Sequence, residues 1–176
     1  MALVPELKTP RLRLRALAEE DLQAWSQVTS DPEVTRHLGG ATLSREETWR
    51  RLLATAGSWP ILGYGYWTVE SKDDGRMIGH VGFADFKRDL TPSLEGLPEM
   101  GWVFARDVHG QGYASEAVKA GLQWAERELA GQTLTAIIHP ENAASIRVAE
   151  KAGFGQPVET RYRGEPILIF YRQPAS

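Results

Sequence analysis

The chain contains no cysteine, and this absence removes several classes of chemistry at once. Without a thiol there is no cysteine nucleophile, no disulfide framework and no cysteine-ligated zinc or iron–sulfur site. The 4 histidines are widely dispersed along the sequence, and no two of them have the spacing of metal ligands. The sequence therefore predicts a protein that needs no metal, and a metal-dependent hydrolase is the remotest interpretation.

Long apolar runs and blocks of like charge are lacking as well. The N-terminal segment MALVPELKTPRLRLR has no basic stretch followed by a long apolar one, and no apolar run anywhere reaches the length of a membrane span. The formal net charge is -3, and the 20 Lys and Arg residues are scattered, so the electrostatic footprint of a nucleic-acid binder is missing. We expect a cytoplasmic monomer or homodimer that binds neither nucleic acid nor membrane.

The residues that are present indicate one ordinary α/β domain spanning residues 1–176. Hydrophobic residues make up 42% and charged residues 24% of the sequence, as in soluble globular proteins. Period-2 alternation, short apolar runs and helical spacing of apolar residues mark the elements. Strands are predicted at 11–15, 64–71, 77–86, 99–104, 134–139, 157–163 and 166–172, and helices at 18–29, 44–57, 113–130 and 142–152.

The segment HGQGYASE, residues 109–116, places two glycines directly before a predicted helix. The first turn of a helix has backbone N–H groups without intrahelical partners and carries the positive end of the helix dipole. Glycines ahead of it let an anion such as a phosphate approach those groups. A plain turn with glycine at positive φ is the alternative, and neither a GxxxxGK[ST] nor an N-terminal GxGxxG motif supports nucleotide hydrolysis or dinucleotide binding.

A second candidate region is HPENAASIRVAEKAGF, residues 139–154. Asn142 has the position of a helix N-cap, and Ser145 lies three residues further along. Both side chains are therefore expected at the open end of this helix, beside the strand that stops at His139. Capping alone explains Asn142, and a polar residue in a first helical turn explains Ser145 equally well.

Several motifs follow one another in a particular order along nearly the whole chain: TPRLRLR with the following EEDL, then DPEVTRHLG, MIGHVGF, EMGWVF, HGQGYASEA and NAASIRVAEKAGF. In this order they resemble the GCN5-related N-acetyltransferases (GNAT), and specifically the branch of RimJ/RimL-type ribosomal-protein N-terminal acetyltransferases. The resemblance implies the GNAT fold, with a mixed, mostly antiparallel central sheet that is splayed between strands 4 and 5 and flanked by helices.

The resemblance also implies that acetyl-CoA is the co-substrate and lies across the splayed strands. Its pyrophosphate is expected on the loop that runs from Val108 to Ala114, and its pantetheine on the backbone of a bulged strand EMGWVF, where Gly101 suits an irregularity. Asp107 precedes this loop at a position where the family usually has Gln or Arg, and a carboxylate facing the pyrophosphate is unfavourable. The cofactor-binding residues expected from the resemblance are Trp102, Val103, Phe104, Val108, His109, Gly110, Gln111, Gly112, Tyr113, Ala114, Asn142 and Ser145.

Acetyl transfer needs a proton acceptor for the amine and a proton donor for the leaving thiolate. Glu99, on the strand beside the expected cofactor site, is the candidate general base, and a solvated carboxylate at a strand start is the alternative. Ser145 is the candidate donor, since the tyrosine that some relatives use is replaced by Ala149. His80 and Asp85 are further candidates, for which a packed histidine and a turn carboxylate are the simpler interpretations.

The expected acceptor is a primary amine, with a protein or peptide N-terminus as the first choice. A small-molecule amine such as an amino acid, polyamine or antibiotic remains open, because acceptor pockets in this fold are built from variable loops. A non-catalytic acyl-CoA sensor is the alternative from another class. Four aromatic residues are candidates for an acceptor pocket, although core packing explains most of them: Trp25, Trp67, Phe83 and Trp102.

Overall fold

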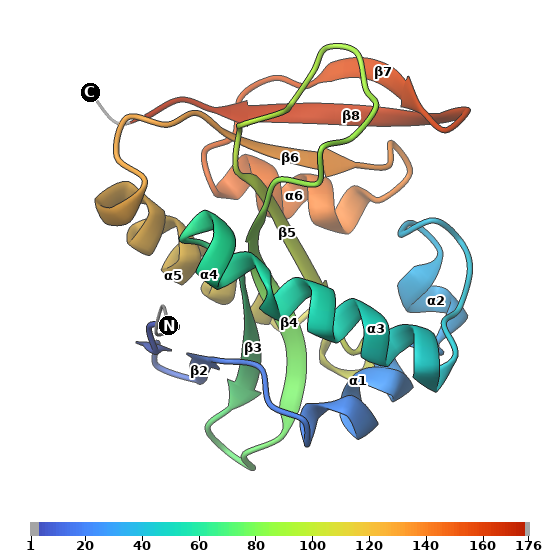
Figure 1. Ribbon diagram of the computed structural model, residues 1–176, viewed down its shortest axis with the longest axis vertical. Coiled ribbons are helices and arrows are strands. Elements are labelled where there is room, and N and C mark those ends of the chain that lie inside the picture. Colours follow the sequence, from blue (N-terminus) through green and yellow to red (C-terminus); the bar gives the residue numbers. More distant parts are fainter. Residues whose placement is uncertain (1–3, 175–176) are drawn as a thin grey trace.

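A computed structural model describes residues 4–174, which form one eight-stranded sheet with helices on both faces (Figure 1). The strand order in the sheet is β1-β2-β3-β4-β5-β6-β8-β7. The strands are β1 (Leu7–Lys8), β2 (Leu12–Arg15), β3 (Tyr66–Ser71), β4 (Met77–Ala84), β5 (Glu99–Phe104), β6 (Leu134–Ile138), β7 (Val158–Tyr162) and β8 (Glu165–Arg172). The helices are α1 (Asp21–Thr29), α2 (Pro32–Thr35), α3 (Arg45–Ala56), α4 (Ser58–Leu62), α5 (Tyr113–Glu128) and α6 (Ala143–Lys151).

The sheet divides between β5 and β6, its only parallel neighbours in the described part of the chain. These two strands pair through Glu99 and Thr135, and no further residue pair joins them within residues 4–174. In Figure 1, β6, β7 and β8 run across the top, whereas β3, β4 and β5 run down the view. The mixed, mostly antiparallel sheet with a splay between the fourth and fifth predicted strands is therefore confirmed.

Alternation along the strands assigns each helix to a face of the sheet. Helix α5 covers the face that carries Trp67, Phe83 and Met100, whose side chains lie against Gly121. Helix α1 covers the opposite face, where Trp25 stacks on His80 with 3.9 Å between the ring centroids. Met100 and Glu99 are consecutive in β5, so the Glu99 side chain lies on the α1 face.

The predicted helices and strands are all present, and the structure adds four short elements that the sequence patterns did not predict: β1, α2, α4 and a 3₁₀ turn at Arg106–Val108. Strand β1 pairs with β2, and helices α2 and α4 lie in segments for which no element is predicted. A signal for α2 was available, because the Asp31 side chain accepts a hydrogen bond from the backbone of Glu33 and Pro32 occupies the first helical turn. Within residues 4–174, no helix combines the length and apolar character that crossing a membrane requires.

Candidate functional site

A cavity of about 510 Å³ lies where β5 and β6 diverge. Three groups of residues meet there: the end of β5, the loop that leads into α5, and the first turns of α6, with α2 and the residues after it on the remaining side. The predicted cofactor residues that line the cavity are Trp102, Val103, Phe104, Val108, His109, Gly110, Gly112, Tyr113, Ala114, Asn142 and Ser145. Segments that are far apart in the sequence thus share one concave surface.

The edge of β5 that faces the cavity carries backbone groups that β6 does not pair. Ala105 donates its N–H to the Ile78 carbonyl on the other side, at 2.9 Å. Backbone groups of successive strand residues point to opposite edges, so Trp102 and Phe104 direct theirs toward the splay. The strand therefore offers the N–H and C=O groups of Trp102 and the N–H group of Phe104 to an extended ligand.

The bulge predicted for β5 is absent from its pairing with β4, which runs without a shift from Gly79 with Phe104 to Ala84 with Glu99. That prediction was wrong, and the glycine at position 101 is needed for another reason. A Cβ atom at this position would lie 2.1 Å from the Tyr66 hydroxyl oxygen. Glycine is required because the neighbouring tyrosine fills the space of a side chain.

Both loop glycines adopt conformations that other residues rarely adopt. Gly110 has φ 75° and Gly112, the N-cap of α5, has φ 81°. No side chain caps this helix, in contrast to α6, where the Asn142 carboxamide oxygen accepts a hydrogen bond from the Ser145 backbone at 3.2 Å. The first N–H groups of α5 therefore remain free to bind an anion at the cavity.

The loop is held from outside by the N-terminal segment, through residues to which the sequence analysis gave no role. Arg11 Nε contacts Glu116 Oε2 at 2.7 Å, and Arg11 Nη1 donates to the Gln111 carbonyl at 2.9 Å. Thr9 Oγ1 donates to Glu116 Oε1 at 2.6 Å. Burial alone raises the pKa of Glu116, but the hydrogen bonds from Thr9 and Arg11 outweigh it and lower that pKa. The loop and the start of α5 are thus tied to β2.

The remaining loop side chains secure the backbone. His109 Nε2 donates to the Phe104 carbonyl at 2.9 Å, which joins the loop to the end of β5. Gln111 does not line the cavity, and its side-chain amide donates to the Asp107 carbonyl at 3.1 Å. The Asp107 carboxylate forms an ion pair with Arg76 at 2.7 Å, outside the cavity. Asp107 therefore does not oppose an anion on the loop.

Helix α6 adds two cations to the cavity. Arg147 and Lys151 both line it and lie one turn apart, and Ser145 and Val148 of the same helix line it as well. Among the lining residues of the described chain, Glu33 is the one carboxylate. The charge at the cavity therefore favours an anionic ligand.

Glu99 lies at the closed end of the splay and is not a lining residue. Its side chain is buried, and its two oxygens accept hydrogen bonds from Arg88 at 2.8 and 2.9 Å. Tyr66 lies close by, and burial together with the Glu99 charge raises the pKa of its phenol. Glu99 is therefore a buried carboxylate that Arg88 holds in one orientation, on the face of the sheet opposite α5.

The other candidates have structural roles. His80 is 4% exposed, and burial lowers its pKa to about 4. Asp85 accepts hydrogen bonds from the backbones of Lys87 and Gly96, as expected for a turn carboxylate. Of the four aromatic candidates, Trp102 lines the cavity, whereas Trp25, Trp67 and Phe83 are buried in the hydrophobic core.

The histidines are less dispersed in space than in the sequence. His37, after α2, and His139, at the end of β6, stack with 5.2 Å between their ring centroids. Spacing along the sequence could not show this pair, because the fold brings together segments about a hundred residues apart.

Comparison with known proteins agrees with this geometry. A family model described as an acetyltransferase (GNAT) domain matches residues 11–155. The protein YkkB of Bacillus subtilis (strain 168) is 31% identical, over 96% of this chain and 95% of that protein. The structure of an acetyltransferase from Agrobacterium tumefaciens str. C58 superposes with a TM-score of 0.80 at 28% identity, covering 97% of this chain and 95% of that one.

More distant structures share the fold alone. RimL, a ribosomal L7/L12 alpha-N-protein acetyltransferase solved with coenzyme A, has a TM-score of 0.77 at 18% identity and covers 97% of this chain and 98% of its own. AAC(6')-Ib, solved with Parmomycin and AcetylCoA, has a TM-score of 0.75 at 17% identity and covers 92% of this chain and 93% of its own. The same architecture therefore serves different amine acceptors.

Proposed function

Because the chain belongs to the GNAT acetyltransferase family, we propose that it transfers the acetyl group of acetyl-CoA to a primary amine, with a protein or peptide N-terminus as the acceptor. One observation carries the proposal. The uncapped N-terminus of α5 and the unpaired edge of β5 border the same cavity. The first suits a pyrophosphate, and the second suits the amide groups of pantetheine.

In the proposed complex the pyrophosphate contacts the backbone N–H groups from Gly110 to Ala114. The free edge of β5 at Trp102 and Phe104 hydrogen-bonds the pantetheine and directs the thioester into the splay. Arg147 and Lys151 supply positive charge for the remaining phosphate of the coenzyme. Asn142 orients the start of α6, which brings Ser145 to the cavity.

The proposed reaction is direct transfer. The amine nitrogen attacks the thioester carbonyl carbon, and the carbonyl oxygen becomes an oxyanion. The Trp102 backbone N–H, on the open edge of β5, is the proposed donor to that oxygen. The carbonyl re-forms as the carbon–sulfur bond breaks, and the former amine loses a proton to a base. The Ser145 hydroxyl gives a proton to the departing thiolate and takes one back from solvent water, so the serine ends the reaction unchanged.

Glu99 is the proposed base, acting directly or through water. It lies on the sheet face opposite α5, so an acceptor that arrives past α2 would approach the thioester from the side of Glu99. Its two hydrogen bonds from Arg88 fix the orientation of the carboxylate, which a base requires. An N-terminal amine, with a pKa of roughly 7.7 to 8.0, needs only modest assistance from such a base.

A protein N-terminus is preferred as acceptor because the ordered motifs of the chain resemble the RimJ/RimL branch, and the RimL structure shares the fold. The likeness to AAC(6')-Ib supports a small-molecule amine as the second candidate. The splay is open toward α2, where Glu33 and Leu38 line the cavity and can contact either kind of acceptor.

The deciding experiment is titration calorimetry with acetyl-CoA, followed by thiol release against a panel of peptide N-termini and small amines. Turnover with peptides and not with small amines is the expected result. Turnover confined to small amines would show that the acceptor is a small molecule and not a protein N-terminus. Binding of acetyl-CoA without turnover on any acceptor would favour an acyl-CoA sensor. A folded protein that does not bind acetyl-CoA would overturn the proposal.

A further inference from the structure

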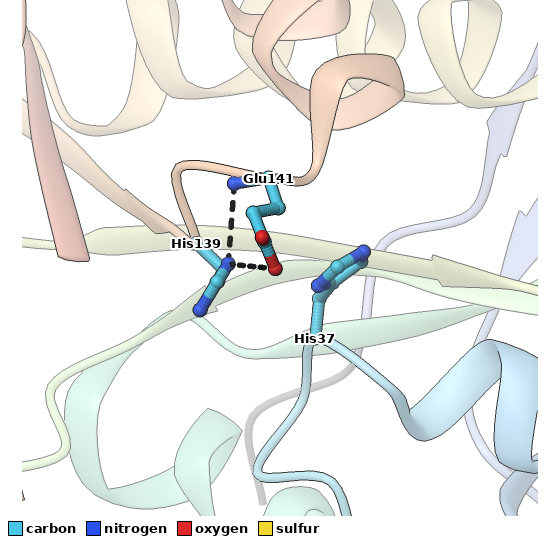
Figure 2. Close-up of side chains that lie close together, drawn as sticks. All are labelled: His37, His139 and Glu141. Atoms are coloured by element: carbon cyan, nitrogen blue, oxygen red, sulfur yellow. Dashed lines mark hydrogen bonds and ion pairs between the residues drawn. The ribbon is translucent and has the colours of Figure 1, made fainter. Parts of the chain in front are cut away.

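Three potential metal ligands meet beside the cavity. His37 comes from the segment after α2, and His139 and Glu141 come from the turn between β6 and α6. One ligand atom from each residue lies within 4.8 Å of the other two. Figure 2 shows the Glu141 carboxylate between the two imidazole rings. None of the three residues belongs to the cofactor loop or to the free edge of β5.

The ring nitrogens of the two histidines have few hydrogen-bond partners among the described residues. His139 Nδ1 accepts a hydrogen bond from the Glu141 backbone N–H at 3.2 Å, so this nitrogen carries a lone pair. The ring nitrogens of His37 form no hydrogen bond within the described chain. A neutral imidazole is the form that binds a metal.

We propose that His37, His139 and Glu141 bind a divalent transition-metal cation, with Zn²⁺ as the representative ion. Two imidazole nitrogens and one carboxylate oxygen form a ligand set that suits such cations and leaves a fourth position for water. The weak hydrogen bond to His139 Nδ1 is the one interaction that the metal replaces.

The three atoms must move closer together to reach zinc, whose bonds to nitrogen and oxygen are about 2.0 to 2.2 Å long. Side-chain rotation suffices, because Glu141 Oε2 is already 4.0 Å from His139 Nδ1 and the Glu141 side chain is 76% exposed. His37 precedes Gly39 and Gly40, both at positive φ, in a loop whose backbone is not constrained by a sheet. The bound cation would lie at the edge of the cavity, because His37 also lines it.

The test uses the full chain without an affinity tag, since a polyhistidine tag binds the same ions. Calorimetric titration with ZnCl₂ is expected to show one cation per chain. His37→Ala, His139→Ala and Glu141→Gln should each weaken binding by at least about tenfold, because even outer-shell changes cost that much. His109→Ala is the matched control and should bind zinc as the wild type does.

Electron paramagnetic resonance with Cu²⁺ as the probe tests the ligands directly. Two coordinated imidazole nitrogens are expected in the wild type and one in either histidine variant, with circular dichroism to show that each variant is folded. Absence of a saturable single site would overturn the proposal. Wild-type zinc affinity in all three ligand variants would overturn it as well, as would a loss of affinity in His109→Ala as large as that in the ligand variants. A protein that binds acetyl-CoA but not zinc would overturn the metal site and leave the acetyltransferase intact.

Discussion

Arg11 and Glu116 are 105 residues apart in the sequence, yet their side chains form an ion pair of 2.7 Å. The Arg11 guanidinium also lies 4.2 Å from the centre of the Tyr113 ring and donates to the Gln111 carbonyl. A residue near the start of the chain thus holds the loop on which we place the pyrophosphate. Arg11 is a positioning residue in this scheme.

Arg11→Ala is expected to weaken acetyl-CoA binding by about tenfold, equivalent to about 1.4 kcal/mol, because the loop loses its external support. The rate at saturating acetyl-CoA should change much less, which a purely structural defect would not produce. Arg13→Ala is the control, because Arg13 lies on the same strand and pairs with Glu6 and Glu70 away from the loop. Equal Kd values for the two variants would contradict the role of Arg11.

Gly112→Asp should weaken acetyl-CoA binding by at least about tenfold, because the new carboxylate would face the pyrophosphate at the start of α5. Gly112 has φ 81°, so any side chain there is strained. Gly112→Asn separates the two effects, since Asn has nearly the same shape, tolerates this φ and carries no charge. Calorimetry that gives the same Kd for the folded Asp and Asn variants would refute the assignment of the loop.

Glu99→Gln is expected to lower kcat/KM by about a hundredfold near neutral pH, within the range of general-base catalysis. The defect should shrink at high pH, where the acceptor amine is already unprotonated. Arg88→Met is the matched control, because it breaks the same ion pair and keeps the carboxylate. A pH–rate profile of Glu99→Gln that matches the wild type, or equal losses of rate in both variants, would remove Glu99 from the role of base.

Gly101→Ala should reduce the free energy of unfolding by about 1 to 3 kcal/mol, the usual cost of overpacking. The added methyl group would meet the Tyr66 hydroxyl, and removal of that hydroxyl in Tyr66→Phe should recover part of the loss. Urea denaturation of both single variants and the double variant measures this coupling. Strictly additive effects would show that Gly101 is required for another reason.

His80 should make stability depend on pH in the acidic range. Its pKa in the folded protein is about 4, below the ordinary 6.5, so between these values the unfolded chain binds more protons. The stabilisation is complete above about pH 6.5 and is lost as the pH falls toward 4, by about 3 kcal/mol in total. His80→Gln should flatten the wild-type curve over this interval. Parallel curves for His80→Gln and the wild type would contradict this account.

Local sequence patterns determined most of the secondary structure. The Ser44 and Glu47 capping box is formed, Asn142 caps α6, and both loop glycines have positive φ. These signals are readable because each involves groups within a few residues of one another. The same patterns, in their order, also indicated the acetyltransferase family, which the family model matches over residues 11–155.

Only the tertiary structure decided which side chains from distant parts of the sequence contact one another. It pairs Arg11 with Glu116 and Glu99 with Arg88, and it turns Asp107 toward Arg76. It also brings His37 and His139 together beside the cavity. The side-chain types alone are compatible with many partners. Which contacts form depends on the strand order and on where β5 and β6 separate, and both follow from packing the whole chain around one core.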